Sequence, residues 1–578
     1  MLAFFIVVLY QQYDQIADYK LKKVELAFAL VLGFCMNLGY GLMRGNGFNV
    51  FYGSVTAAIV SFISLAYYCF VSVYLVKFLF CRADEWLSSG ADDTKKPKSK
   101  LVNKAFALIE KNQYKFYLLV ILAAWAVPFL FNFPGLIMYD TRNQVDMYLH
   151  IPNHHTNASV LLNENQYITQ HHSVPHTILV GFLFDMGVKI FGTYDAGVFV
   201  YCLIQYAVMA VIMAYMFKSI KPYLGVKWTF IFLALFALHP FFSISVIHII
   251  KDIYFCGLFV IYMLKYYELI RDPNKIKDKK FFFVFLLLTI GLIILRNNAI
   301  YTLLIVSAVL FFAYKHKKAI VLYVLAFMAF NFAYTGLLTA FDISPGSPRE
   351  MLSVPFQQTA YYVSKYGDEV TEEEKEAISK VLDYEVVCTE YDPILSDPIK
   401  DTYNKYATTD DLINYFKVWF KMFLKHPWSY VESFIHLNYG YYYPGVKRQV
   451  TYDCYNSYGA RKVMRNNDGF TELSANVPNV FQHICLLVQY LASFAPILCF
   501  MVDTGVFIWV WIFMILFIVR RFKEKKKYIL YYIPYFAYII FILVGPANGV
   551  NYGRYIMPFV FCWPLIMLPL FEYKNTKE

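Results

Sequence analysis

The sequence contains few charged residues and lacks the usual motifs of soluble enzymes. Only 16% of its 578 residues are charged, whereas 59% are hydrophobic and the mean hydropathy is +0.45. Soluble globular domains do not have that balance. The chain also has no Gly-rich phosphate loop followed by a strand, no G-x-S-x-G nucleophile motif and no H-E-x-x-H zinc motif. These absences disfavour hydrolysis of soluble nucleotides and serine hydrolysis.

Cysteine motifs and a secretion signal are also missing. The ten cysteines are scattered without a C-x-x-C pair, which disfavours a metal or redox role for them. Cys388 and Cys454 lie in one outer region, where they either form a disulfide or stay reduced. Residues Met1–Tyr10 are apolar but lack a basic start and a small-residue cleavage site. We therefore interpret them as a short or truncated membrane segment and not as a cleaved signal.

Long hydrophobic runs dominate what is present. Runs of about spanning length predict an all-α polytopic membrane protein with about 12 transmembrane helices, integral to the cell membrane. Basic clusters between the runs explain the net charge of +11, which fits the positive-inside pattern better than nucleic-acid binding. Aromatic residues make up 20% of the chain, which is typical of interfacial belts and packing, with stacking on sugar rings as the alternative. The runs are residues 24–43, 53–79, 116–132, 194–217, 228–247, 253–270, 281–296, 299–314, 319–340, 500–520, 528–545 and 554–571.

The loop charges predict that both ends of the bundle are cytoplasmic. This topology requires that the apolar segments 174–192 and 480–497 stay on the outer side, as interfacial helices. The outer part is expected to be mainly helical, with a capping box at Thr371 and a second, amphipathic helix that is capped by Thr409. Four parts result: N-terminal accessory segments (1–115), a core (116–340) with a first outer loop (133–193), an extracytoplasmic region (341–499) and C-terminal transmembrane helices (500–578).

Asp140 is the first candidate for a functional residue. It follows Pro134-Gly135, a turn just beyond the outer end of a predicted membrane helix. A carboxylate at that boundary is costly unless water, a partner or a substrate uses it. A general base must be a carboxylate, a histidine or a similar group near the reacting carbon. Asp140 is therefore a candidate base, and an ordinary loop aspartate paired with Arg142 is the alternative.

Charged residues at three other helix ends fall on the same predicted side. Lys251-Asp252 interrupts an apolar stretch, so it is either a solvated turn or a pair in a cavity where the lysine binds phosphate. Arg296-Asn297 is a similar interruption and a functional candidate. Arg554 starts the last span, where it either grips a lipid phosphate or anchors the helix at the interface. Together these charges suggest chemistry on an anionic lipid.

Two polar groups in the outer regions are weaker candidates. His171-His172-x-x-Pro-His176 can ligate a metal, contact a sugar or phosphate, or serve no specific role, and its spacing matches no standard metal site. We select His172 and His176 as substrate-binding residues and assign no metal ligand. Gln357 and Gln358 can bind sugar hydroxyls, although a structural role is the alternative.

The order of these features resembles the GT-C superfamily of polytopic glycosyltransferases, in particular a Gram-positive bacterial branch. The features are an Asp that opens the first outer loop, a His/Pro segment before an interfacial helix, a Lys-Asp turn, an Arg-Asn turn, a Gln-Gln pair, a His-Pro and a final Gly-Arg-Tyr. The resemblance covers about residues 116–571. The chain departs from better-known members, which often have Asp-Glu where this chain has Asp140-Thr141.

The resemblance implies an inverting transfer of sugar from a polyprenyl-phosphate donor to an acceptor hydroxyl of a cell-envelope glycan or lipid, on the outer face. Asp140 would be the base, and Lys251, Arg296 and Arg554 would hold the phosphate. We expect no cofactor, with a divalent cation left open. A flippase or transporter of lipid-linked glycans is the alternative, but it predicts charges near the midplane and an internal repeat. Outer-face transfer of an acyl or phosphoalcohol group is the second alternative.

Overall fold

The protein is a bundle of helices, described by a computed structural model. The structure describes residues 11, 13–44, 47–89, 110–161, 166–444, 446, 480–495, 498–499, 503–522, 525–545, 548–549 and 552–576. Within these residues there is no strand, only four isolated bridges. The predicted all-α class is therefore confirmed for this part of the chain. The apolar N-terminal segment 1–10 and Cys454 lie outside the described residues.

Eight described helices are long and apolar enough to cross a membrane, or nine if the pair α30 (Tyr552–Phe561) and α31 (Trp563–Thr576), bent by 41°, forms one span. An 18-residue helix is about 27 Å long, close to the thickness of the hydrocarbon core. The count of 12 stays a prediction, because α14 (Lys279–Leu295), α15 (Ala299–Ala313) and α29 (Ile533–Val544) are shorter. The eight helices are α3 (Lys23–Arg44), α5 (Val55–Ser88), α7 (Gln113–Phe131), α10 (Val174–Phe191), α11 (Tyr194–Leu238), α13 (Lys251–Arg271), α16 (Lys317–Ala340) and α27 (Thr504–Arg521).

Two predicted boundaries differ in the structure. The runs 194–217 and 228–247 join in the 45-residue α11, which is interrupted at Gly225 (φ 74°, ψ 175°), and the second run ends in the short α12 (Pro240–Ser245). A positive φ is accessible to glycine at little cost, so Gly225 breaks the helix without a loop. Helix α10 passes the same length and composition test as the spanning helices. Its predicted place along the interface stays a prediction.

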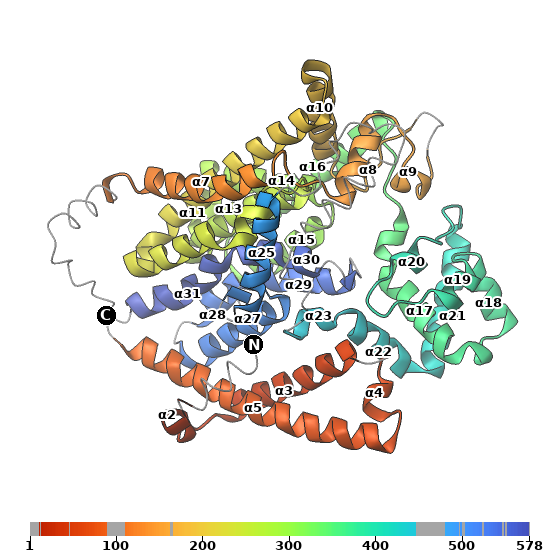
Figure 1. The fold of residues 1–578 in the computed structure, drawn as a ribbon, viewed down its shortest axis with the longest axis horizontal. Coiled ribbons are helices and arrows are strands. Elements are labelled where there is room, and N and C mark those ends of the chain that lie inside the picture. Colours follow the sequence, from red (N-terminus) through yellow and green to blue (C-terminus); the bar gives the residue numbers. More distant parts are fainter. Residues whose placement is uncertain are drawn as a thin grey trace.

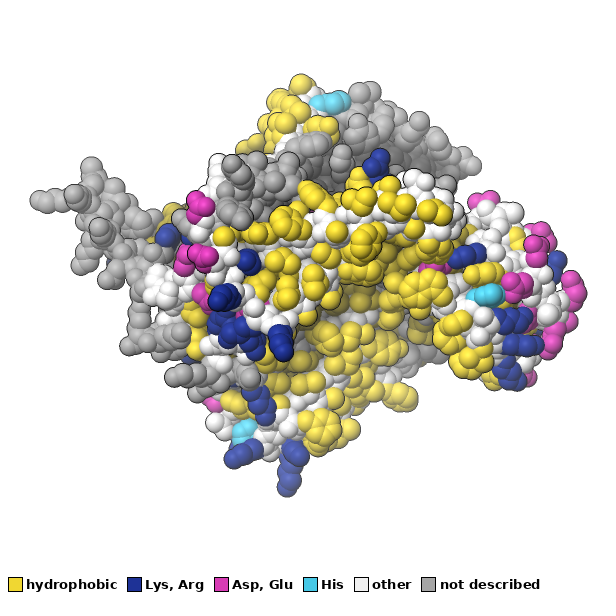
Figure 2. All heavy atoms as spheres, turned by 90° about the horizontal axis from the view of Figure 1, so that it is seen from below, with side chains coloured by type: hydrophobic (Ala, Val, Ile, Leu, Met, Phe, Trp, Pro, Cys, Tyr) yellow, Lys and Arg dark blue, Asp and Glu magenta, His cyan; other side chains and the backbone are white. Residues whose placement is uncertain are grey.

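The outside of the bundle is apolar. Figure 2 shows hydrophobic side chains over the middle of one face, between charged side chains at the two ends. Large apolar side chains of α5, α15 and α16 are exposed, including Phe62 (72%), Phe312 (81%) and Phe332 (83%). In water such a surface would be strongly unfavourable, whereas lipid chains cover it at no cost. The protein is therefore embedded in a membrane.

The region between α16 and α23 (Tyr439–Tyr442), which the sequence predicts to be extracytoplasmic, forms a separate helical unit, hereafter the outer unit, at the right of Figure 1. Its buried residues form their own hydrophobic cluster, which includes Phe356, Tyr415 and Tyr430. The capping box at Thr371 is confirmed, whereas the cap of α21 is Thr408, one residue before the predicted position. The unit consists of η2 (Pro348–Met351), α17 (Ser353–Tyr366), η3 (Gly367–Glu369), α18 (Glu372–Ser379), α19 (Tyr384–Thr389), α20 (Asp397–Lys400), α21 (Thr409–Lys425) and α22 (Pro427–Leu437).

The N-terminal helices α3 and α5 lie side by side as a hairpin below the core in Figure 1. Arg521 at the end of α27 joins them to the core, because its guanidinium contacts Glu25 (3.0 Å), Asp84 (2.7 Å) and the Tyr19 hydroxyl (2.8 Å). At the other end of the hairpin, Tyr52 donates a hydrogen bond to Glu432 of the outer unit. The remaining elements are α2 (Tyr13–Ala17), α4 (Asn49–Tyr52), α8 (Tyr139–Tyr148), α9 (His154–Asn157), η1 (Pro273–Lys277), α25 (Val480–Phe494) and α28 (Lys525–Tyr531).

Candidate functional site

A short extended segment places the start of α8 beside the start of α13. The Leu136 amide donates to the Ile247 carbonyl (3.0 Å), and the Ile249 amide donates to the Leu136 carbonyl (2.9 Å). The Thr141 hydroxyl then donates to the Ile249 carbonyl (2.6 Å). These bonds satisfy backbone groups between two helices, where they would otherwise be unpaired. Residues more than 100 positions apart are thereby brought to one place.

Gly135 allows this arrangement. Its φ of +146° is rarely adopted by other residues, and a Cβ atom there would lie 2.3 Å from the Cys202 sulfur of α11. Both the conformation and the close approach therefore require glycine. The predicted turn at Pro134-Gly135 directs the chain from α7 into the segment that leads to Asp140.

Four charged side chains form a continuous network of ion pairs, hereafter the charge network: Asp140, Asp252, Arg296 and Arg554. The Arg554 guanidinium donates to Asp140 Oδ2 (2.5 Å) through Nη2 and to Asp252 Oδ2 (2.6 Å) through Nε. The other oxygen of Asp252 accepts from Arg296 Nε (2.7 Å). These side chains come from the starts of α8, α13 and α30 and from the end of α14. The structure therefore brings together the four residues that the sequence analysis placed at separate helix ends.

The Arg296 guanidinium contacts three aromatic side chains in addition to Asp252. It donates to the Tyr538 hydroxyl (2.7 Å), and its guanidinium carbon lies 5.2 Å from the ring centre of Phe255 and 5.9 Å from that of Tyr555. Cation–π contacts of this kind add to the ion pair when they are shielded from water. Because Asp252 already neutralises Arg296, this arginine is better suited to hold the network in place than to bind a ligand alone.

Lys251 is next to the charge network but has no acidic partner. Its Nζ lies 3.3 Å from His172 Nδ1 and 3.5 Å from the His171 carbonyl, and no carboxylate of the described residues is within ion-pair distance. A partly buried ammonium without a counter-ion favours an anionic ligand. The predicted role of Lys251 and His172 in substrate binding is compatible with this position.

Asp140 is ionised and partly accessible. Burial acts to raise the pKa of its carboxyl, but Arg554 and Lys251 outweigh burial and hold that pKa below its ordinary value. The side chain of Asp140 is 23% exposed, whereas that of Asp252 is only 2% exposed. Of the two carboxylates, Asp140 is therefore the one that a substrate can reach.

His176 and Asn297 connect neighbouring elements of the site through hydrogen bonds. The His176 ring is held between Gln144 (2.9 Å) and the Tyr201 hydroxyl (2.6 Å), both of which are buried. The Asn297 amide donates to the Gln170 carbonyl (3.1 Å), so it ties the α14–α15 turn to the first outer loop. In the structure both side chains contact protein groups.

Gln357 and Gln358 lie in the outer unit. The amide of Gln357 donates to the Asp392 carbonyl, and that of Gln358 donates to the Tyr430 carbonyl (3.3 Å). These bonds connect α17 with its neighbours and favour the structural alternative. Among the described contacts, neither amide reaches the charge network.

Several residues near the site could not be identified as such from the sequence. Asp401 and Glu350 of the outer unit pair with the buried Arg349, which also contacts His154 (2.9 Å). His155 stacks on His171, with ring centres 3.6 Å apart. The only available signal was the high content of His and Asn in residues 153–172, which does not reveal which rings meet.

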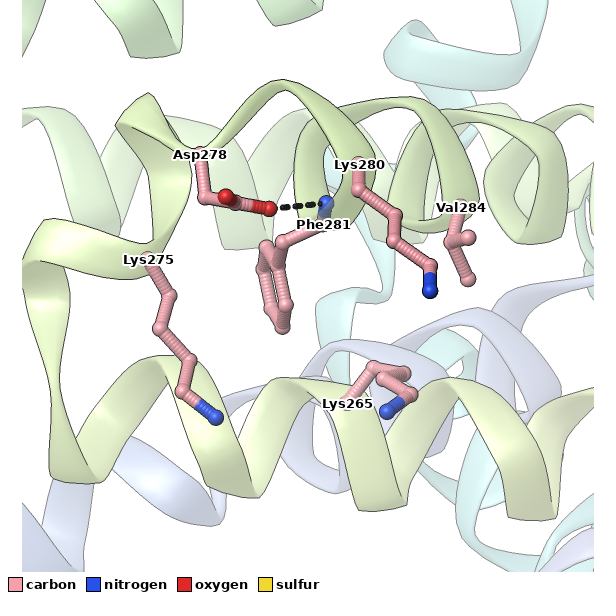
Figure 3. A pocket seen from close by; sticks show the side chains of 6 residues that line it. All are labelled: Lys265, Lys275, Asp278, Lys280, Phe281 and Val284. Carbon is pink, nitrogen blue, oxygen red and sulfur yellow. Dashed lines mark hydrogen bonds between the residues drawn. The ribbon is translucent and has the colours of Figure 1, made fainter.

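A pocket of about 270 Å³ lies elsewhere, between α13, η1 and α14 (Figure 3). Its lining includes Lys265, Lys275 and Lys280, and Asp278 caps α14 by accepting a hydrogen bond from the Phe281 amide. Lys265 and Lys275 both pair with Glu268. Since Lys251 opens α13 and Lys265 is four turns along it, this pocket is about 20 Å from the charge network.

The comparisons with known proteins identify a family but no function. Residues 11–578 match the sequence model of DUF6020, a family of unknown function. No curated protein and no solved structure matches the chain.

Proposed function

The chain belongs to the DUF6020 family, and we propose that it is an inverting membrane glycosyltransferase that uses a polyprenyl-phosphate sugar on the outer face of the cell membrane. One observation carries the proposal: an accessible carboxylate, Asp140, shares a site with Arg554 and with Lys251, which has no acidic partner among the described residues. A transferase of this type needs a base for the acceptor and cations for the departing phosphate.

The proposed reaction is a single displacement. Asp140 takes the proton of an acceptor hydroxyl, and the oxygen forms a bond to the anomeric carbon of the sugar. The bond between that carbon and the phosphate oxygen breaks, and both of its electrons leave with the lipid phosphate. Lys251 and Arg554 neutralise the phosphate, while Asp252 and Arg296 keep Arg554 in position.

The arrangement of the charges favours an enzyme over a flippase. The charged side chains lie in the first turns of α8, α13 and α30 and at the end of α14, so they gather at helix ends. Transporters place substrate groups near the midplane, between repeats of their fold. A cluster at one end of the bundle fits chemistry at the membrane surface.

The decisive experiment is sugar transfer by purified full-length protein in lipid vesicles. Radiolabelled polyprenyl-phosphate sugars are supplied with a cell-envelope lipid fraction as the acceptor, and wild type is compared with Asp140→Asn. We expect transfer to vanish in the variant while donor binding persists. Asp185→Asn is the matched control, because among the described residues Asp185 pairs only with Lys189, on the surface of α10.

Two outcomes would contradict the proposal. Equal transfer by wild type and Asp140→Asn would exclude this aspartate as the base. Donor binding without transfer, together with movement of the labelled lipid across the vesicle membrane, would establish the flippase alternative.

A further inference from the structure

Three histidine rings meet in the first outer loop, beside the charge network. His155 comes from α9, and His171 and His172 precede α10. One ring nitrogen of each lies within 4.8 Å of the other two. The rings of His155 and His172 are nearly perpendicular, with centres 4.8 Å apart. His155 and the pair His171-His172, which is 16 and 17 positions further along the chain, thus form one compact cluster of imidazoles.

The cluster contains buried polar atoms that have no partner. Both ring nitrogens of His155 and Nε2 of His172 accept or donate no hydrogen bond among the described residues. His155 is only 7% exposed, and His172 is only 3% exposed. A buried polar group without a partner costs about 1–3 kcal/mol, so three in one cluster point to a missing ligand.

We propose that His155, His171 and His172 bind one transition-metal ion, with Zn²⁺ as the first choice, and leave a fourth position open. Three histidines with one open position are typical of catalytic zinc sites. A tetrahedral ion about 2.1 Å from each nitrogen needs nitrogens about 3.4 Å apart, so the ring nitrogens, which lie within 4.8 Å of one another, must move closer by up to about 1.4 Å.

A carboxylate outside the cluster supports this assignment. His171 Nδ1 lies 3.9 Å from Glu350 Oε1. Metal-bound histidines usually direct their second nitrogen to a carboxylate, which fixes the ring and raises its basicity. Glu350 would have this role, and loss of its charge should weaken metal binding about 10- to 100-fold.

The Lys251 ammonium should weaken metal binding. Its ammonium donates to His172 Nδ1, so the hydrogen of that neutral ring is on Nε2. Binding of the metal through Nε2 moves this hydrogen to Nδ1, and Lys251 must then turn towards the His171 carbonyl, which is already within reach. Removal of the ammonium should therefore tighten metal binding.

The test is the metal content of the purified full-length protein after equilibration with Zn²⁺, and its visible spectrum with Co²⁺. We expect one ion per chain and the strong absorption of tetrahedral Co²⁺. The variants His155→Ala and His172→Ala should each lower the affinity more than about 100-fold, since loss of a ligand costs more than loss of its outer partner. Lys251→Met should raise it.

His436→Ala is the matched control, because this histidine is also buried but belongs to no such cluster in the described part of the chain. Wild-type protein without metal or Co²⁺ absorption would overturn the proposal. Unchanged affinity in both histidine variants would also overturn it, whether or not they keep the wild-type melting temperature. Metal binding is measured without sugar transfer. Absence of metal binding would therefore not count against the transferase proposal, and absence of transfer would not count against the metal site.

Discussion

Arg554 is the single residue that connects the two carboxylates of the charge network. It uses Nη2 for Asp140 and Nε for Asp252, so the geometry depends on a planar group with several donors. Arg554→Lys keeps the charge but cannot bond both carboxylates in the same positions. We expect sugar transfer to fall by about 100-fold or more, the range seen when a preorganised donor is lost.

Initial rates at saturating donor will measure this effect, with Arg82→Lys as the control. Arg82 forms an exposed pair with Glu85 one turn away on α5, so its replacement should leave transfer unchanged. Activity of Arg554→Lys at the wild-type level would show that a point charge is sufficient at this position.

Asp146 gives the fold a pH dependence that the sequence did not indicate. Burial raises the pKa of its carboxyl to about 6, and Arg142 opposes this only in part. Below pH 4 both the folded and the unfolded state hold the proton. Between pH 4 and 6 the unfolded state loses it first, so the free energy of unfolding falls, and above pH 6 the penalty stays constant.

Asp146→Asn removes this penalty. At pH 7 the variant should be more stable than wild type by up to about 3 kcal/mol, which corresponds to a shift of about two pKa units. The difference should shrink towards zero at pH 4. Melting temperatures in detergent across this range will measure it, and a difference that is equal at both pH values would contradict the assignment.

Sequence analysis found the charged residues of the site but not their partners. Asp140, Lys251, Arg296 and Arg554 were recognisable because charges at the ends of apolar runs are rare and costly. That Asp252 joins two arginines depends on how α13, α14 and α30 pack, which no local pattern specifies. His155 was missed for the same reason, since the neighbours of a loop histidine are set by the fold of the whole loop.

At the scale of elements, the turn at Gly135 decides whether α8 and α13 start side by side. Gly135→Ala forces a Cβ atom against the Cys202 sulfur and leaves alanine at φ +146°. We expect a lower melting temperature and loss of transfer. Adding Cys202→Ala should recover only part of the stability, because the backbone strain persists.

Gly336→Ala is the matched control for this change. Gly336 lies within α16 with no atom near the position of a Cβ, and alanine favours a helix over glycine by about 1 kcal/mol. The control should be as stable as wild type or more so. Equal behaviour of the two variants would show that the turn at Gly135 does not position the site.

The positions of the helices were easier to predict than their lengths. Every predicted hydrophobic run is mainly helical in the described residues, because long apolar stretches in lipid have few alternatives to a helix. The join across Gly225 and the break between α28 and α29 at Tyr532 were not predicted. The join depends on the positive φ of Gly225, which hydropathy does not register.

At the scale of the whole molecule, Arg521 attaches the N-terminal hairpin to the core. Glu25 is fully buried and Asp84 is partly buried, so Arg521→Ala leaves two carboxylates without their main partner. Breaking a buried pair costs about 3–5 kcal/mol. We expect the hairpin to be cleaved faster by a protease added to detergent-solubilised protein, before the core is attacked.

Mass spectrometry of the fragments will identify the first cleavage. Arg82→Ala is again the suitable control, because its ion pair is exposed and contributes little. Fragmentation of Arg521→Ala at the wild-type rate would show that the contacts of Tyr52 with the outer unit are sufficient to hold the hairpin.

The contact between Arg554 and Asp140 lowers the proton affinity of the Asp140 carboxylate. In the proposed reaction, a lipid phosphate competes with Asp140 for the same guanidinium, and the carboxylate becomes a stronger base as Arg554 turns to the phosphate. The donor itself would then switch on the base. An acceptor hydroxyl that arrives before the donor meets an aspartate with little proton affinity, so deprotonation of the acceptor is coupled to the presence of the sugar phosphate.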